Sequence, residues 1–208
     1  PIAYDLKEAY EIEKICKINH ITLLVNFFRR YENSALEIKK RLLDYKKFRV
    51  IVYYSNGIIN NGSHFIDLII FWFGYPNKIK RIKGQKLSSK KDFNLDFKFE
   101  YKDGDVNFFS WEEAFYSNYF VKIFTDKLRL DYDFNGYITK SYDIINNDKF
   151  KGFKKIDQSP EIILNNLNQE FKSVYDYMDS LLRAKELKQI NNLETPRIIN
   201  TLLRNYDK

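Results

Sequence analysis

The sequence predicts an α+β fold: an open, mostly antiparallel β-sheet with helices packed on one face, preceded by the last helix and strand of a truncated α/β unit. Three observations predict it. The chain begins with apolar residues at helical spacing and then a short, continuously apolar run, which is typical of a buried parallel strand. Its middle part alternates apolar and polar residues between turn residues. Its C-terminal part returns to helical spacing.

The first residues set the domain division. Residues 3–18 predict a helix, because acidic residues lie early and lysines late, as the helix dipole favours. Residues 21–25, Ile-Thr-Leu-Leu-Val, predict a strand. A helix followed by a strand at this point is typical of the end of an α/β domain. We therefore assign residues 1–26 to an incomplete domain and residues 27–208 to an α+β domain.

The rest of the chain predicts a sheet between helices. Phe93, Leu95, Phe97, Phe99 and Tyr101 point one way and the polar residues between them the other, which is typical of an antiparallel sheet packed on helices or on a partner subunit. The predicted strands cover residues 48–55, 77–83, 93–101, 105–112, 117–124, 127–133 and 136–143, the further helices residues 34–45, 64–74, 160–186 and 195–206, and a loop residues 144–160.

Composition limits the function classes. The net charge is +7, but 28 acidic residues are mixed with 35 basic ones, and the basic run Lys78–Lys83 suits a solvated edge strand. No nucleic-acid recognition motif occurs, so we expect no nucleic-acid partner. Cys16 is the only cysteine and there are two histidines, so we expect no metal site. The longest apolar run is far below the ~18 residues that span a bilayer, and no signal peptide is visible; we expect a cytoplasmic protein with no membrane contact.

The candidate site lies where a polar, glycine-containing loop meets the apolar helix. Gly62 permits unusual backbone angles, and Asn61 or Ser63 can cap the helix. His64 and Asp67 are three residues apart and share one helix face. A histidine beside a carboxylate can transfer protons near neutral pH; the alternative is a histidine that only satisfies a local hydrogen bond.

A second candidate follows the first strand. Arg29 and Arg30 lie just beyond it, and the strand ends of α/β sheets are common ligand sites. Both arginines therefore suit a phosphate or carboxylate group, and the alternative is a solvated charge pair.

Taken together, these segments resemble the Gfo/Idh/MocA family of NAD(P)-dependent oxidoreductases. Residues 1–3, Pro-Ile-Ala, look like the end of the family's Glu-Lys-Pro segment, and residues 25–31 look like its strand-to-arginine crossover. Residues 60–68, which are followed by Trp-Phe-Gly at 72–74, look like its Asp-x-Gly-x-His-x-x-Asp-Leu motif. The order and spacing agree across residues 1–74, and the motif at residues 60–68 is the most specific of the three matches.

The resemblance implies a Rossmann domain that binds NAD or NADP and a sheet domain that contacts a sugar or sugar-nucleotide substrate and often forms a homo-oligomer. It implies that His64 is the acid/base residue, with Asn60 at the position of the family's aspartate. Asn can orient a ring but cannot stabilise an imidazolium. The other implied contacts are Pro1 and Arg30 with the cofactor, and Arg29, Tyr54 and Asp67 with the substrate. Asp67 is also a candidate to orient His64.

Two parts of the family pattern are absent from this sequence. No Gly-x-Gly-x-x-Gly occurs, so a pyrophosphate cradle is missing, and so is the family's catalytic lysine, which would precede Pro1. We therefore expect the C-terminal part of an oxidoreductase that transfers hydride to or from a sugar hydroxyl or ketone. By itself the chain is expected to be inactive and not to bind the cofactor tightly. The alternative is a non-catalytic interaction or oligomerisation scaffold.

Overall fold

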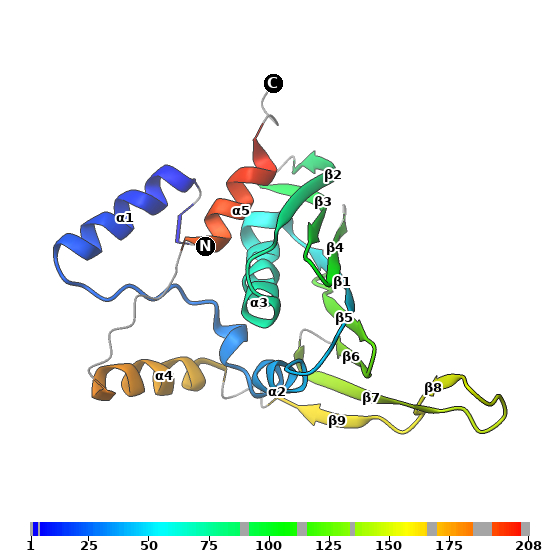
Figure 1. Ribbon diagram of the computed structural model, residues 1–208. Coiled ribbons are helices and arrows are strands. Elements are labelled where there is room, and N and C mark those ends of the chain that lie inside the picture. Colours follow the sequence, from blue (N-terminus) through cyan, green and yellow to red (C-terminus); the bar gives the residue numbers. More distant parts are fainter. Residues whose placement is uncertain are drawn as a thin grey trace.

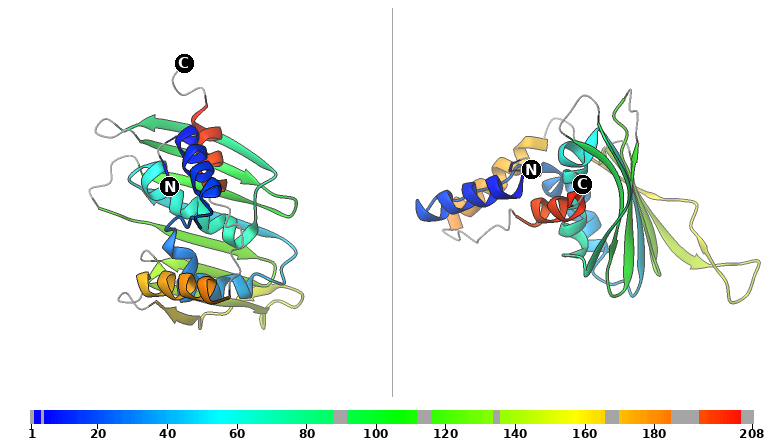
Figure 2. Two further views of the ribbon diagram at one scale, coloured as in Figure 1. Left: turned by 90° about the vertical axis from the view of Figure 1, so that its left-hand side faces the viewer. Right: turned by 90° about the horizontal axis from the view of Figure 1, so that it is seen from above.

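The computed structural model describes residues 2–3, 5–87, 92–111, 116–133, 136–165, 170–184 and 193–204. Within these residues a single mixed sheet forms one layer, and helices form a second layer on one of its faces (Figures 1 and 2). The predicted α+β class, an open and mostly antiparallel sheet with helices on one face, is confirmed.

The sheet has the strand order β2-β3-β4-β1-β5-β6-β7-β8, with β9 also paired to β7. Among the described strands, only the central pair β1 and β4 is parallel, and the other pairs are antiparallel. The described strands are β1 Phe48–Ser55, β2 Lys78–Lys86, β3 Phe93–Glu100, β4 Gly104–Trp111, β5 Phe120–Thr125, β6 Leu128–Asp133, β7 Ile138–Asn146, β8 Lys154–Ile156 and β9 Glu161–Leu164.

The described helices differ in how they meet this sheet. Figure 1 shows α2, α3 and α5 against the sheet, while α1 stands away from it. Two short helical turns, one 3-10 and one π, lead into α2 and α3. The bounds are α1 Leu6–Ile18, η1 Phe28–Tyr31, α2 Asn33–Arg41, η2 Gly57–Gly62, α3 Ser63–Phe73, α4 Glu170–Ala184 and α5 Glu194–Leu203.

The core lies between α3 and the central strands. Eight of the eleven residues of α3 are buried, because the helix is apolar on nearly every side. Alternate residues of β1, such as Val50 and Val52, are fully buried beneath it. The indole nitrogen of Trp72 donates to the Ala35 carbonyl oxygen at 2.9 Å and so fastens α3 to α2. The core therefore fixes α3, the helix that carries His64, relative to the sheet.

Three predictions of secondary structure are wrong. Residues 144–160, predicted as a loop, contain the end of β7 and strand β8, which pair with each other. Residues 21–25 form no strand and take no part in the described sheet. The helix predicted from about residue 160 is instead strand β9, which pairs with β7 through Ile163 and Thr139, and helix α4 begins only at Glu170. Residues 161–164 form a strand because β7 offers a free edge for pairing, although the Ser-Pro-Glu sequence at 159–161 is typical of a helix start.

Candidate functional site

The candidate site is built at the start of α3, where the chain leaves β1 through an abrupt turn. Asn56 takes a left-handed conformation with φ of 64°, and Gly57 follows with φ of 90°. The π-helical turn η2 then runs directly into α3. Such wide helical turns are rare, and they occur frequently at functional sites.

A buried carboxylate from outside the helix caps this turn. Asp92, just before β3, accepts hydrogen bonds from the backbone nitrogens of Ile59 and Asn60, each at 2.9 Å. The carboxylate thus satisfies free N–H groups at the positive end of the helix. A Cβ atom on Gly57 would lie 2.2 Å from an Asp92 oxygen, so glycine is required there by close approach as well as by its positive φ.

The predicted capping by local residues is therefore wrong. Gly62 has an ordinary helical φ of −56°, and its lack of a side chain instead makes room for the Tyr54 ring, 3.0 Å from where a Cβ would be. The side chain of Asn61 donates to the Ser55 carbonyl oxygen, and the Ser63 hydroxyl donates to that of Asn60. Neither side chain caps the N–H groups of α3.

His64 is half-buried in the first turn of α3, among aromatic side chains. Its ring meets that of Phe27 edge-on at a centroid distance of 5.4 Å, and that of Phe28 at 5.6 Å. Its Nδ1 atom is buried and has no hydrogen-bond partner among the described residues. Burial, and then the nearby positive charge of Arg29, lower the pKa of His64 to about 4. The ring is therefore uncharged at neutral pH.

Arg29, on η1, lies in an aromatic cage. Its guanidinium carbon is 5.1 Å from the centroid of the Phe28 ring, 5.2 Å from that of Phe65 and 5.5 Å from that of Tyr119. Its Nη1 donates to the Tyr132 hydroxyl at 3.5 Å and lies 3.9 Å from Glu32. These contacts fix the charge of Arg29 close to His64.

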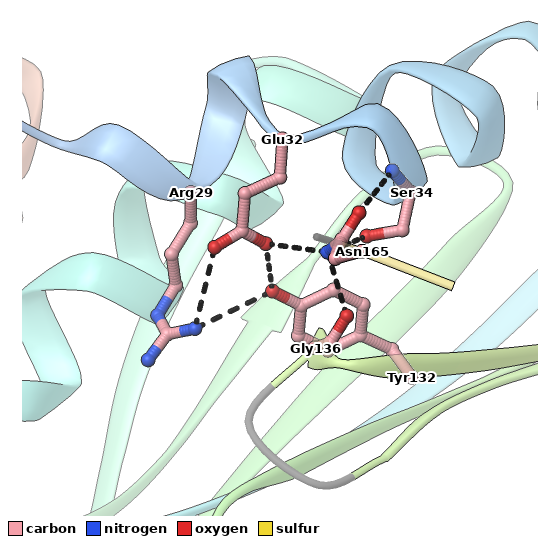
Figure 3. A network of polar contacts seen from close by, with 6 residues as sticks. All are labelled: Arg29, Glu32, Ser34, Tyr132, Gly136 and Asn165. Carbon is pink, nitrogen blue, oxygen red and sulfur yellow. Dashed lines mark hydrogen bonds and ion pairs between the residues drawn. The ribbon is translucent and has the colours of Figure 1, made fainter. Parts of the chain in front are cut away.

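The polar contacts behind Arg29 form a network of residues that are distant in sequence (Figure 3). The Tyr132 hydroxyl donates to Glu32 at 2.8 Å, and the Asn165 amide donates to the same carboxylate oxygen at 3.1 Å. The Asn165 amide also donates to the hydroxyl of Ser34, and its oxygen accepts from the backbone nitrogen of that residue. The network joins η1 and α2 to β6 and to the end of β9.

Arg30 and Asp67 form a separate ion pair. Arg30 Nε donates to Asp67 at 2.8 Å, and Nη2 bonds the second carboxylate oxygen. Burial raises the pKa of Asp67 to about 6, although Arg30 opposes the rise, so the carboxylate is still ionised at neutral pH. Asp67 is therefore occupied by Arg30, and the structure does not bring it to His64 as an orienting partner.

The other predicted site residues lie in different surroundings. The Asn60 side chain is exposed, and its described polar contacts are backbone ones, to Asp92 and Ser63. Tyr54 is fully buried, and its hydroxyl donates to the Leu95 carbonyl oxygen at 2.7 Å, so a ligand could reach it only if the core rearranged. Pro1 lies outside the described residues.

Sequence reasoning brought His64 and Arg29 forward but missed Glu32, Tyr132 and Asp92. Tyr132 lies in a predicted strand, where an inward-facing tyrosine is ordinary core. Asp92 and Glu32 are single carboxylates among many on a charged chain. No local sequence signal distinguishes them, because Glu32 and Tyr132 are 100 residues apart.

The described residues hold neither a metal-binding cluster nor a membrane-spanning helix. No group of three His, Cys, Asp or Glu side chains there is arranged to hold a metal ion. Within the same residues, no helix combines the length and apolar character needed to cross a membrane.

Comparison with known proteins identifies the fold. No known family profile and no curated protein sequence matches the chain. UDP-N-acetylglucosamine 3-dehydrogenase GnnA from Acidithiobacillus ferrooxidans has a TM-score of 0.73 at 12% identity, over 98% of this chain and 67% of that one. The dehydrogenase MviM from Clostridium difficile has a TM-score of 0.69 at 14% identity, over 97% of this chain and 67% of that one.

A third structural neighbour is an oxidoreductase from Agrobacterium radiobacter, solved with NAD+, L-tartaric acid and magnesium. Its TM-score is 0.64 at 14% identity, over 96% of this chain and 67% of that one. The chain thus spans about two thirds of the length of these neighbours. The neighbours are oxidoreductases of the Gfo/Idh/MocA-like type, and the chain has the fold of their C-terminal domains.

Proposed function

We propose that this chain supplies the substrate and proton-transfer part of an NAD(P)-dependent oxidoreductase of the Gfo/Idh/MocA type. The observation that carries the proposal is His64: an uncharged, half-buried imidazole at the start of α3, next to Arg29, in a sheet domain of this fold. An imidazole in that state can exchange a proton with a substrate hydroxyl within hydrogen-bond reach.

The proposed substrate is a sugar or sugar nucleotide whose hydroxyl or ketone gains or loses hydride. The structural likeness to GnnA, a UDP-N-acetylglucosamine 3-dehydrogenase, supports this substrate class. Arg29 is the proposed substrate contact nearest to His64. Arg30 and Asp67, which bond each other, have the role of holding η1 against α3, and so of keeping Arg29 in place.

The residues of this chain do not by themselves fit a nicotinamide cofactor. Its sequence has no glycine-rich phosphate turn, and Arg30, the predicted cofactor contact that the structure describes, is bound to Asp67. The NAD+ bound to the Agrobacterium oxidoreductase supports this cofactor class for the proposed enzyme. NAD or NADP would have to be bound mainly by a further domain or chain.

We also propose that residues 1–26 pack against that cofactor-binding part. Helix α1 buries only Ala9, and Ile15, Ile18 and Ile21 are more than half exposed. Four of the five residues at 21–25 are apolar, and the segment lies outside the described helices and strands. An apolar helix face next to such a segment suits a sheet with helices on it.

The sheet face away from the helices is the proposed homo-oligomer surface. There the Tyr53 ring stacks on that of Phe120 at 5.1 Å, and the ring of Trp111, which is 38% exposed, meets Tyr53 edge-on. Exposed aromatic residues are common at interface centres. Light scattering should show an assembly that dissociates in Trp111→Glu; a monomeric wild-type protein would refute this surface.

The test of the main proposal is activity of the native gene product with His64 replaced. UDP-sugars and free sugars are supplied with NAD+ or NADP+, and reduced cofactor is followed by its absorbance. We expect His64→Gln to lower kcat by roughly 10²–10⁴, the usual contribution of a general acid/base. His20→Gln, in the only other histidine, is the matched control and should retain activity. Redox activity that does not depend on His64 would refute the proposal.

The second candidate function is a non-catalytic interaction scaffold. It is favoured by the exposed Asn60 side chain and by the absence of a described partner for His64 Nδ1, since a base normally has an orienting acceptor there. A scaffold would assemble through the open sheet face and show no turnover with any sugar or sugar nucleotide tested.

A further inference from the structure

We propose that Arg29, held by Glu32 and Tyr132, is a positioning residue that keeps His64 uncharged. The inference rests on the proposed role of His64 in proton transfer, and it assigns the control of that role to a network of residues on other elements. An uncharged imidazole can accept the hydroxyl proton of an alcohol, whereas an imidazolium cannot. When the substrate binds, His64 would thus already be uncharged, which is the state that can remove a hydroxyl proton.

Arg29 and His64 share the same aromatic surroundings. The Phe28 ring lies 5.1 Å from the guanidinium carbon of Arg29 and 5.6 Å from the centroid of the His64 ring. Phe65, which follows His64 on α3, lies 5.2 Å from the same guanidinium carbon. These apolar rings exclude water around both groups, so the positive charge acts on the imidazole with little screening.

Arg29 is held in position by buried polar groups. Its Nη1 contacts the Tyr132 hydroxyl and Glu32, and both of these residues are almost completely buried. Glu32 itself accepts hydrogen bonds from Tyr132 and from Asn165. A long arginine side chain therefore loses its freedom to swing into solvent, where its effect on His64 would be screened.

A charged His64 would need a hydrogen-bond acceptor for the proton on its buried Nδ1 atom. An imidazolium carries a proton on each nitrogen, and Nδ1 has no hydrogen-bond acceptor among the described residues. Burial and the Arg29 charge both lower the pKa of the ring. Asp67, on the same helix face, is neutralised by Arg30. Lys39 of α2 lies over the Phe71 ring, and Glu194 of α5 interacts with the Arg30–Asp67 pair.

The experiment is an NMR titration of the histidine ring nitrogens in the full chain, from about pH 3 to pH 8. His64 signals are assigned by their loss in His64→Gln, and the amide spectrum reports whether each variant is folded. We expect Arg29→Gln to raise the His64 titration midpoint by on the order of one pH unit, because a neighbouring charge is removed. Arg29→Lys, which keeps the charge, should restore most of the low midpoint.

The matched control is Arg49→Gln, which removes the same charge from an exposed arginine on β1 and should leave the midpoint unchanged. Equal midpoints in wild type and Arg29→Gln, or equal shifts in Arg29→Gln and Arg49→Gln, would overturn the proposal. If Arg29→Gln does not fold, Tyr132→Phe serves as the second test of the proposal. This variant keeps the aromatic ring but removes the hydroxyl that holds Arg29, so the His64 midpoint should rise by a smaller amount. An unchanged midpoint in Tyr132→Phe would overturn the proposal.

This titration separates the inference from the proposed function, because it needs no substrate. If Arg29→Gln raises the midpoint but the native gene product has no redox activity, the positioning role of Arg29 is supported and the proposed oxidoreductase function is refuted. If the native gene product is active, the acid limb of its kcat/KM profile should move to higher pH in Arg29→Gln. A residue with only a structural role would lower stability without moving that limb.

Discussion

Helices α3 and α1 share several features in sequence but differ in almost every energetic respect. Each carries apolar residues, a cap with an aspartate and an ion pair. In α3 the apolar residues are buried, Asp92 from a distant segment caps the turn η2 that runs into the helix, and Asp67 pairs with Arg30 inside the protein. In α1 only Ala9 is buried, Asp5 caps its own helix, and Lys17 pairs with Glu13 at the surface.

The difference shows that the same interaction types count differently according to solvent access. Burial removes apolar surface from water and makes an unpaired charge or N–H group costly. On α1 water can replace each lost partner. The candidate site is on α3, where loss of a partner has the greater cost. Three paired substitutions and one pH dependence test this comparison.

The largest effect is expected from the ion pairs. Arg30→Gln leaves Asp67 buried without its partner, and we expect the free energy of unfolding to fall by about 3–5 kcal/mol. Lys17→Gln, in the exposed pair of α1, should cost about 0.3–0.5 kcal/mol. Urea denaturation at pH 7 measures both. Similar losses for the two variants would contradict the contrast between the helices.

The next effect concerns apolar side chains. Ile66 of α3 is fully buried, so Ile66→Ala should lower the free energy of unfolding by about 2–5 kcal/mol through lost burial and a cavity. Ile15 of α1 is 59% exposed, and Ile15→Ala should change it by about 0.5 kcal/mol or less. The same denaturation experiment applies. A large loss in Ile15→Ala would show that α1 has a packing partner in solution.

The caps should differ more modestly. Asp92→Ala leaves the buried N–H group of Ile59 and the part-buried N–H group of Asn60 without this acceptor, and we expect a loss of about 1–3 kcal/mol. Asp5→Ala removes an exposed cap and should cost about 0.5–1 kcal/mol. Asp92→Asn retains one acceptor and should lie between wild type and Asp92→Ala. Thermal unfolding followed by circular dichroism orders the three proteins, and an Asp92→Asn more stable than wild type would contradict this capping role.

The smallest effect is a pH dependence from His64. Its pKa is lowered to about 4 in the folded protein, against about 6.5 when unfolded, so the unfolded chain binds more protons between these values. Stability is therefore lost as the pH falls from 6.5 towards 4. We expect the stability difference between wild type and His64→Gln to change by about 1 kcal/mol between pH 7 and pH 5.

Asp67 acts in the opposite direction in the same range, because its raised pKa lets the folded protein hold a proton up to about pH 6. It is present in both proteins of this comparison, so its contribution cancels in the difference. A pH-independent difference between wild type and His64→Gln would show that the folded protein does not lower the pKa of His64.

Much of the fold could be predicted because it depends on short-range patterns. The alternation of Phe93 to Phe99 predicts β3, and the apolar run after His64 predicts α3. Residues 21–25 and 161–164 could not be predicted in this way. Whether an apolar run becomes a strand depends on a free neighbouring edge, and that edge belongs to another part of the chain.

The features of the candidate site likewise fall into those that local sequence determines and those that tertiary contacts determine. The sequence by itself determined that His64 begins an apolar helix and that two arginines follow residues 21–25, since both facts are matters of local order. Only the tertiary structure decided that Arg29 joins Tyr132 and Glu32 beside His64, whereas Arg30 binds Asp67. Neighbours in sequence point to different sides of a helical turn, and their charges act on whatever the fold brings within a few ångströms.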